Sequence, residues 1–207
     1  MTARPTAAVL DYDAGNVRSA KRGFDAAGAE ATITTDPAVA QASDVLVVPG
    51  VGHFSTCLAQ LRRSGLEAVV SSFIADQRPV FGICVGMQLL YERSEEGDEP
   101  GLGLLPGGVE RFPADAVVPH MGWDVVHPAA GRDDDPLLAG VAGERLYFVH
   151  SYYAVPDASA HVVGRCAYGG VDFPCLVREG SVVGTQFHPE KSGAIGQRVL
   201  RNWLASL

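Results

Sequence analysis

The stretch Arg78-Pro-Val-Phe-Gly-Ile-Cys84-Val-Gly-Met-Gln-Leu-Leu90 decides the fold of this chain. Its apolar residues 80–83 predict a short buried strand, and the helix-favouring residues 87–93 predict a helix directly after it. Cys84 lies at the corner between Gly82 and Gly86, in the pattern G-x-C-x-G, which is a thiol version of the nucleophile elbow. The corner is tight, so the residues two before and two after Cys84 must be small. A thiol at the start of a helix is favoured as thiolate by free N–H groups and by the helix dipole.

Strands and helices alternate in the first part of the chain. Strands are predicted at residues 7–10, 31–34, 45–48 and 80–83, with helical patterns after Asn16, after Asp36 and at residues 55–63 and 66–76. Gly28 is expected to end the first helix. This alternation predicts an α/β fold with a doubly wound parallel sheet. Ligands bind beyond the carboxyl ends of the strands in such sheets, and both Cys84 and the turn Pro49-Gly-Val-Gly52 lie there.

The second half of the chain has a different pattern. A loop at residues 94–108 is followed by predicted strands at residues 109–112, 117–127, 146–155, 161–168, 174–178 and 181–187. The amphipathic residues 195–207 predict a closing helix. The chain has no linker, repeat or low-complexity tract, which favours a single domain.

Composition excludes several classes of protein. The 207 residues suffice for one full-sized core, and a net charge of −8 without a basic stripe disfavours nucleic-acid binding. No apolar run approaches the ~20 residues that span a bilayer, and the N-terminus lacks the apolar core of a signal peptide. The four cysteines, Cys57, Cys84, Cys166 and Cys175, have neither zinc-ligand nor disulfide-framework spacing. We therefore expect a reduced, cytoplasmic protein without a metal.

A thiol nucleophile needs a base, and the base needs a group that orients it. Among the six histidines only His188 has a nearby carboxylate in sequence, in His188-Pro-Glu190 at the end of a predicted strand. The order Cys84, His188, Glu190 differs from the nucleophile–acid–base order of α/β-hydrolases. Alone, the motif around Cys84 is also compatible with a buried structural cysteine, and His188-Pro-Glu190 is also compatible with a strand end followed by a solvated turn. Their combination favours a catalytic triad.

Two segments, residues 82–88 (Gly-Ile-Cys-Val-Gly-Met-Gln) and 186–192 (Gln-Phe-His-Pro-Glu-Lys-Ser), resemble motifs of the class I (triad) glutamine amidotransferases. The resemblance to this family extends over nearly the whole chain. This resemblance implies a three-layer, flavodoxin-like fold, formed by residues 1–207 as one domain. Its central, mostly parallel sheet would be flanked by helices, with added antiparallel strands in the second half of the chain. The resemblance also implies hydrolysis of glutamine to glutamate and ammonia by Cys84, His188 and Glu190, with no cofactor.

Within that family the chain resembles glutaminase subunits that pass ammonia to a (β/α)8-barrel cyclase in histidine biosynthesis. The segments that carry this resemblance are residues 10–16, 48–53, 118–124, 147–152 and 189–192. Asp13, Val85 and Ser151 depart from the commoner Gly, Leu and Thr at their positions. The alternatives are a glutaminase subunit of anthranilate or aminodeoxychorismate synthase, a stand-alone cysteine hydrolase, and a non-enzymatic protein on the same fold.

The resemblance also implies roles for further residues. The N–H groups of Val51 and Val85 would form an oxyanion hole, and binding of a ligand to the partner would turn the amide of Val51 into it. The substrate glutamine would contact Gly50, Gly52, Gln88, Ser151 and Tyr152, and the partner would contact Met121, Trp123, Tyr147 and Lys191. His120 and His150 have no acid beside them in sequence and are expected to be structural, while His53, His127 and His161 are expected at the surface or in loops.

Overall fold

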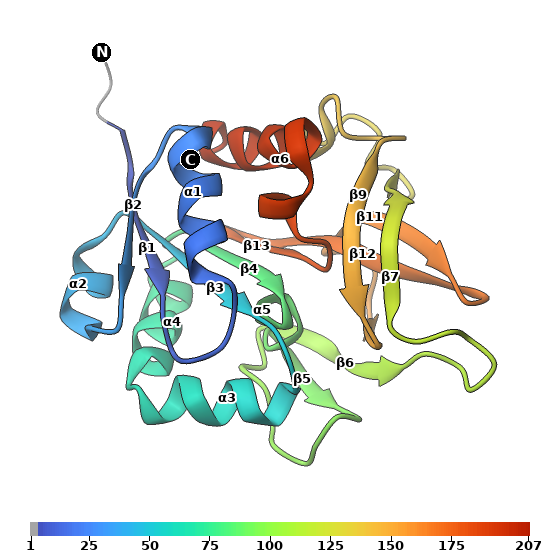
Figure 1. Ribbon diagram of the computed structural model, residues 1–207, viewed down its shortest axis with the longest axis horizontal. Helices are drawn as coiled ribbons and strands as arrows, with labels where there is room; N and C mark the ends of the chain where they lie inside the picture. Colours follow the sequence, from blue (N-terminus) through green and yellow to red (C-terminus); the bar gives the residue numbers. More distant parts are fainter. Residues whose placement is uncertain (1–3) are drawn as a thin grey trace.

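Eight strands form the central sheet of the computed structural model, which describes residues 4–207 (Figure 1). Five of them are parallel: β2 (Glu30–Thr34), β1 (Thr6–Leu10), β3 (Val45–Gly50), β4 (Val80–Cys84) and β13 (Val182–Thr185). The antiparallel strands β12 (Val171–Glu179), β11 (Val162–Tyr168) and β8 (His127–Pro128) extend the sheet beyond β13. The parallel part has the flavodoxin-like order, so the predicted mostly parallel sheet with added antiparallel strands is confirmed.

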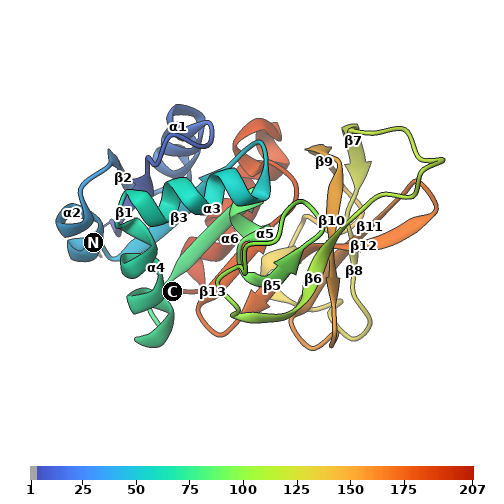
Figure 2. The same ribbon diagram turned by 90° about the horizontal axis from the view of Figure 1, so that it is seen from below.

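Helices cover both faces of this sheet, giving three layers (Figure 2). α1 (Val17–Ala27) and α6 (Gly193–Ala205) lie on one face, and α2 (Pro37–Ala42), α3 (Phe54–Arg63) and α4 (Leu66–Ala75) lie on the other. α1 begins where predicted, because the Asn16 side chain accepts a hydrogen bond from the Ser19 N–H. It ends at Gly28, whose φ of 120° suits glycine.

Three buried aromatic rings fix the strand that carries Cys84. Phe81 of β4 contacts Phe24 of α1 edge-on, with ring centroids 5.6 Å apart, and Trp203 of α6 with centroids 5.0 Å apart. Phe24 and Trp203 also contact each other at 5.8 Å. Since all three rings are fully or almost fully buried, β4 is packed on one face against two neighbouring helices from opposite ends of the chain.

Two smaller sheets lie beside the central one. β5 (Tyr91–Ser94), β6 (Leu105–Arg111) and β10 (Tyr152–Pro156) form a three-stranded sheet. β7 (His120–Val125) and β9 (Arg145–His150) form an antiparallel pair, which stands to the right of the central sheet in Figure 1. A hydrophobic cluster contains buried residues from both halves of the chain.

The main error of the sequence prediction follows Cys84 directly. The helix expected over residues 87–93 is wrong: α5 contains only Val85–Gln88, and the chain then enters β5. β5 pairs with β6, which lies later in the chain, so backbone pairing outweighs the helix propensity of these residues. The predicted strand at residues 146–155 is interrupted at Ser151, and its halves, β9 and β10, belong to different sheets.

Candidate active site

The backbone at Cys84 has the strained geometry of a nucleophile elbow. Its φ is 55° and its ψ is −109°, a conformation that residues other than glycine rarely adopt. A Cβ atom on Gly82 would lie 2.7 Å from the Gly86 carbonyl oxygen, and a Cβ on Gly86 would lie 1.9 Å from the Val48 carbonyl oxygen. The prediction that only small residues fit on either side of the nucleophile is therefore confirmed.

The helix after the elbow is too short to supply a large dipole. α5 has four residues, about one turn, so its dipole is too small to favour the thiolate as strongly as the sequence suggests. Other groups surround the sulfur of Cys84. The Gln186 amide Nε2 donates to it at 3.6 Å, and the thiol itself donates to the Val149 carbonyl oxygen at 3.9 Å.

His188 and Glu190 form the buried pair that the sequence predicted. Nδ1 of His188 lies 2.8 Å from Oε1 of Glu190, and the two side chains are 1% and 3% exposed. Burial alone would lower the pKa of His188, but hydrogen bonding and charge from Cys84 and Glu190 outweigh it and raise the pKa to about 9. Nε2 of His188 is buried and, because Glu190 holds Nδ1, is the ring nitrogen left to interact with Cys84. This nitrogen is therefore free for proton transfer.

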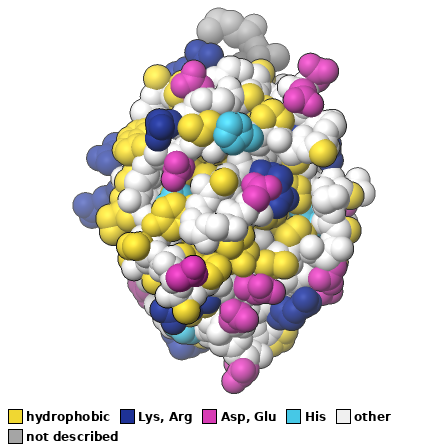
Figure 3. Space-filling view, turned by 90° about the vertical axis from the view of Figure 1, so that its right-hand side faces the viewer, with side chains coloured by type: hydrophobic (Ala, Val, Ile, Leu, Met, Phe, Trp, Pro, Cys, Tyr) yellow, Lys and Arg dark blue, Asp and Glu magenta, His cyan; other side chains and the backbone are white. Residues whose placement is uncertain are grey.

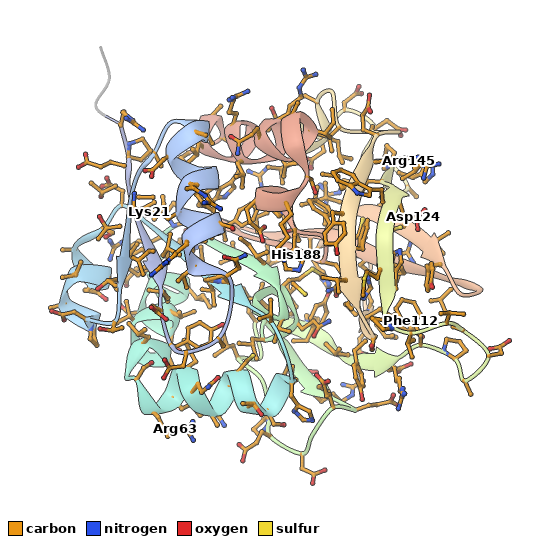
Figure 4. All side chains as sticks on the ribbon, in the orientation of Figure 1. Lys21, Arg63, Phe112, Asp124, Arg145 and His188 are labelled. Carbon is orange, nitrogen blue, oxygen red and sulfur yellow. The ribbon has the colours of Figure 1, made fainter. Side chains whose placement is uncertain are left out.

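The turn that carries His188 is anchored to β9. The His188 N–H donates to the Tyr147 carbonyl oxygen at 2.9 Å, and the Tyr147 N–H donates to the Ser192 hydroxyl oxygen at 2.9 Å. The Ser192 hydroxyl in turn donates to the His188 carbonyl oxygen at 2.7 Å. Figure 4 shows His188 near the middle of the molecule, between the central sheet and the β7–β9 pair. The β7–β9 pair therefore helps to set the position of the imidazole.

A cavity of about 240 Å³ opens beside Cys84. Its size suits a ligand of amino-acid dimensions, since drug-sized ligands occupy pockets of ~300–1,000 Å³. The residues that line it are Val51, Gly52, Cys84, Val85, Gln88, Glu96, Pro119, Val149, His150, Ser151 and Tyr152. Both residues predicted for the oxyanion hole and four of the five predicted for glutamine binding thus surround one cavity.

Gly50 is the predicted glutamine contact that does not line the cavity. It lies opposite Cys84 in the β3–β4 register, and a Cβ there would approach the Gly86 nitrogen to 2.7 Å. Two side chains hydrogen-bond to backbone carbonyl oxygens of the turn Pro49-Gly-Val-Gly52, to which Gly50 belongs. The Tyr12 hydroxyl donates to the Pro49 carbonyl oxygen at 2.6 Å, and the Cys57 thiol donates to the Val51 carbonyl oxygen at 3.3 Å.

Sequence reasoning missed two polar side chains at this site. Glu96 lines the cavity, and its Oε2 accepts a hydrogen bond from the Phe54 N–H at the start of α3. It lies in an acidic loop in which no spacing distinguishes one carboxylate from another. Gln186 is the first residue of the segment 186–192 that carries the family resemblance. Its contact with Cys84 could not be predicted from that segment, because the contact depends on the pairing of β13 with β4.

His120 and His150, which are expected to be structural, hydrogen-bond to each other, and His120 also has an acid partner four residues away in sequence. Nε2 of His120 lies 2.9 Å from Oδ2 of Asp124, and both residues lie on one face of β7 because they are four positions apart on a strand. Nδ1 of His120 lies 3.1 Å from Nε2 of His150, and burial lowers the pKa of His150 to about 3, so His150 is neutral at physiological pH. His161 was expected at the surface or in a loop; it lies in a turn but is buried beside Tyr91.

The four residues predicted to meet a partner lie together near β7 and β9. Met121 and Trp123 are 62% and 49% exposed, and the Trp123 ring lies 6.0 Å from that of its cross-strand neighbour Tyr147. The exposed Lys191 places its Nζ 6.0 Å from the centre of the Tyr147 ring. Figure 3 shows the side of the molecule on the right of Figure 1, where hydrophobic side chains reach the surface among scattered charged ones.

Residues 4–207 contain neither a candidate metal site nor a candidate membrane-spanning helix. No group of three or more His, Cys, Asp or Glu side chains in this part of the chain could hold a metal ion. No helix within the same residues has the length and hydrophobicity needed to cross a membrane.

Comparison with known proteins agrees with the geometry of this site. Residues 8–207 match the family described as "Glutamine amidotransferase class-I", and the chain belongs to this family. Among its relatives is a protein from Synechococcus sp. (strain JA-3-3Ab) named "Imidazole glycerol phosphate synthase subunit HisH". It is 46% identical over 95% of this chain and 92% of the relative. A protein of the same name from Nocardia farcinica (strain IFM 10152) is also 46% identical, over 99% of both chains.

Solved structures with lower sequence identity share the fold. A crystal structure of a glutamine amidotransferase has a TM-score of 0.71 at 24% identity, covering 97% of this chain and 99% of that one. The structure of PurLQS from Thermotoga maritima has a TM-score of 0.76 at 20% identity, covering 99% of both chains. At these identities the likeness is evidence of the fold alone.

Proposed function

We propose that this chain is the glutaminase subunit of an imidazole glycerol phosphate synthase. It hydrolyses glutamine to glutamate and ammonia and passes the ammonia to a partner that makes imidazole glycerol phosphate and AICAR in histidine biosynthesis. The observation that carries this proposal is the strained Cys84 elbow beside the buried His188–Glu190 pair, in a chain whose relatives bear the synthase name. We also propose that residues 1–207 form one domain and that the protein works in the cytoplasm.

The proposed reaction proceeds through a thioester. Sγ of Cys84 attacks the side-chain amide carbon of glutamine, and His188 protonates the leaving nitrogen so that ammonia departs. The raised pKa of His188 suits this step, because the imidazole is protonated at neutral pH. His188 then takes a proton from water, which attacks the γ-glutamyl thioester, releases glutamate and restores Cys84. Glu190 holds Nδ1 and thereby keeps Nε2 available for both transfers.

The cavity provides groups for the rest of the substrate. The N–H of Val85 follows the nucleophile directly and, with that of Val51, would stabilise the oxyanion. The α-ammonium of glutamine needs a negative partner, and Glu96 is the only carboxylate among the residues that line the cavity. Gly50, Gly52, Gln88, Ser151 and Tyr152 would complete the glutamine site.

We propose a (β/α)8-barrel cyclase as the partner subunit and the surface around Met121, Trp123, Tyr147 and Lys191 as its docking site. Exposed aromatic and methionine side chains are enriched at protein interfaces. The Tyr147 ring lies 6.5 Å from that of His188, so this surface is only one side chain away from the proposed base. Ammonia released there would have a short route into the partner.

The test measures glutamate formation by the chain alone and with the cyclase plus the cyclase substrate. Turnover should rise by orders of magnitude with the loaded cyclase and should disappear in Cys84→Ala. The synthase partner of anthranilate synthase should give no such rise. Equal turnover with and without the cyclase would contradict the coupling, and persisting turnover in Cys84→Ala would contradict the chemistry.

A further inference from the structure

The topology of the central sheet places Gln186 directly beside the nucleophile. β13 pairs with β4 in parallel register up to Thr185 opposite Ile83, so the next residue on each strand is Gln186 and Cys84. The Gln186 side chain is fully buried, and its backbone N–H donates to the Cys175 carbonyl oxygen at 2.9 Å. A buried amide must have hydrogen-bond partners, and those of Gln186 belong to the active site.

Both ends of the Gln186 amide are engaged. Its Nε2 donates to Sγ of Cys84 at 3.6 Å, and its Oε1 accepts a hydrogen bond from Nε2 of Gln88 at 3.0 Å. Nε2 of Gln88 also donates to the Tyr152 carbonyl oxygen at 3.0 Å. The three side chains therefore form one chain of hydrogen bonds from the cavity wall to the sulfur.

We propose that Gln186 is a positioning residue of the glutaminase reaction, which holds the Cys84 sulfur in its reactive state and fixes the orientation of the Gln88 amide. The inference rests on the proposed function and adds a residue to its machinery. Gln186 does not line the cavity and acts through Cys84 and Gln88.

The first consequence concerns the sulfur. An N–H donor directed at sulfur stabilises the thiolate more than the neutral thiol, because hydrogen bonds to charged groups are the stronger ones. The bond also directs the thiol proton away from Gln186. The acceptor bonded to the thiol is the Val149 carbonyl oxygen at 3.9 Å, while His188, which is protonated at neutral pH, favours the thiolate by hydrogen bonding and charge.

The second consequence concerns the substrate. Both N–H bonds of Gln88 are used, one by Tyr152 and one by Gln186, so only its carbonyl oxygen is left for the cavity. Gln88 is therefore an acceptor. The substrate group that meets Gln88 must be a donor, such as the amide –NH2 or the α-ammonium of glutamine.

The test follows the pH dependence of Cys84 alkylation by iodoacetamide, read from the mass of the Cys84 peptide. Two Gln186 variants are compared with the wild type. Gln186→Met has a similar shape and loses both hydrogen bonds, while Gln186→Glu keeps an acceptor for Gln88 and loses the donor to sulfur. The control is Gln197→Met, whose amide donates to the Gly23 carbonyl oxygen and not to the sulfur of Cys84.

In both Gln186 variants we expect the alkylation profile to move to higher pH by about one unit, which corresponds to about 10-fold slower alkylation near pH 7. Gln197→Met should follow the wild-type profile. Gln186→Glu keeps the experiment decisive should Gln186→Met fail to fold. Profiles of the folded Gln186 variants that coincide with the wild type would overturn the inference.

Kinetics with the loaded partner provide a second readout. Gln186→Met should lower kcat about 10-fold or more, as loss of a hydrogen bond to a charged group does, whereas Gln88→Met should mainly raise KM for glutamine. An unchanged kcat in Gln186→Met would also count against the inference. Alkylation needs no turnover, so a wild type without glutaminase activity would refute the proposed function while the profiles still report on Gln186.

Discussion

The N–H of His188 donates to the carbonyl oxygen of Tyr147 at 2.9 Å, and this bond joins the proposed base to the strand that bears the exposed aromatic surface. Tyr147 receives the bond on its backbone, while its ring lies between those of Trp123 and His188. A displacement of β9 would therefore move the imidazole. The proposed partner surface and the proposed triad share one strand, which gives partner binding a direct physical route to the chemistry.

Ser192→Ala should loosen this connection. The Ser192 hydroxyl accepts from the Tyr147 N–H and donates to the His188 carbonyl oxygen. Its loss leaves the Tyr147 N–H without this partner, while the His188 carbonyl oxygen keeps only its bond from the Lys191 N–H. We expect the free energy of unfolding to fall by about 1–3 kcal/mol and kcat to fall with it. Urea denaturation and glutaminase assays measure the two effects.

A matched control is Ser206→Ala, because the Ser206 hydroxyl donates to the Trp203 carbonyl oxygen near the exposed C-terminus. This variant should retain stability and kcat close to those of the wild type. Equal effects of the two substitutions would show that Ser192 has no special role in holding His188.

Glu190→Gln should reduce kcat by roughly 10²–10⁴-fold, because an amide at this position no longer favours the protonated imidazole or its productive tautomer. The pKa of His188, raised to about 9 in the folded protein by Cys84 and Glu190 against the effect of burial, should fall. NMR titration of the His188 ring measures it. Glu30→Gln, at an exposed position on β2, is the control and should leave both quantities unchanged.

The raised pKa of His188 also predicts how the stability of the fold depends on pH. The pKa of His188 is higher in the folded state than the ~6.5 of an unfolded histidine. Protonated His188 therefore stabilises the fold fully below about pH 6.5, and this contribution is lost as the pH rises through about 9. The difference in unfolding free energy between wild type and Glu190→Gln should shrink from pH 7 to pH 10. A difference that stays constant over this range would contradict the shift.

The features predicted correctly are those that depend on residues close together in the sequence. The elbow around Cys84, the His188–Glu190 pair, the caps of α1 and the parallel strands each follow from neighbouring residues. The missed features need contacts between distant segments. Residues 91–94 become a strand because β6 pairs with them, Glu96 reaches the cavity through its bond to α3, and Gln186 meets Cys84 through sheet register.

Gly86→Ala should destabilise the elbow strongly. The new Cβ would lie 1.9 Å from the Val48 carbonyl oxygen, a backbone atom of β3 that cannot move without disturbing the sheet. We expect a loss of about 3 kcal/mol or more in the free energy of unfolding, at the upper end of overpacking effects. Urea denaturation measures it. Gly122→Ala is the control, because its Cβ would meet no atom within 4 Å, and equal losses in the two variants would refute the steric argument.

Trp123→Ala should weaken binding of the cyclase partner. The Trp123 side chain is large, half exposed and packed at one edge against Tyr147, as expected of an interface anchor. Truncation of such an anchor costs about 2 kcal/mol or more, which is roughly a 30-fold rise in Kd. Isothermal titration calorimetry with the cyclase measures it. Val39→Ala removes a side chain that is 42% exposed on α2, at the opposite end of the molecule from β7, and should leave Kd unchanged. A Kd that is the same for wild type and Trp123→Ala would place the partner on another surface, and the short route from His188 through Tyr147 would then lead only to solvent.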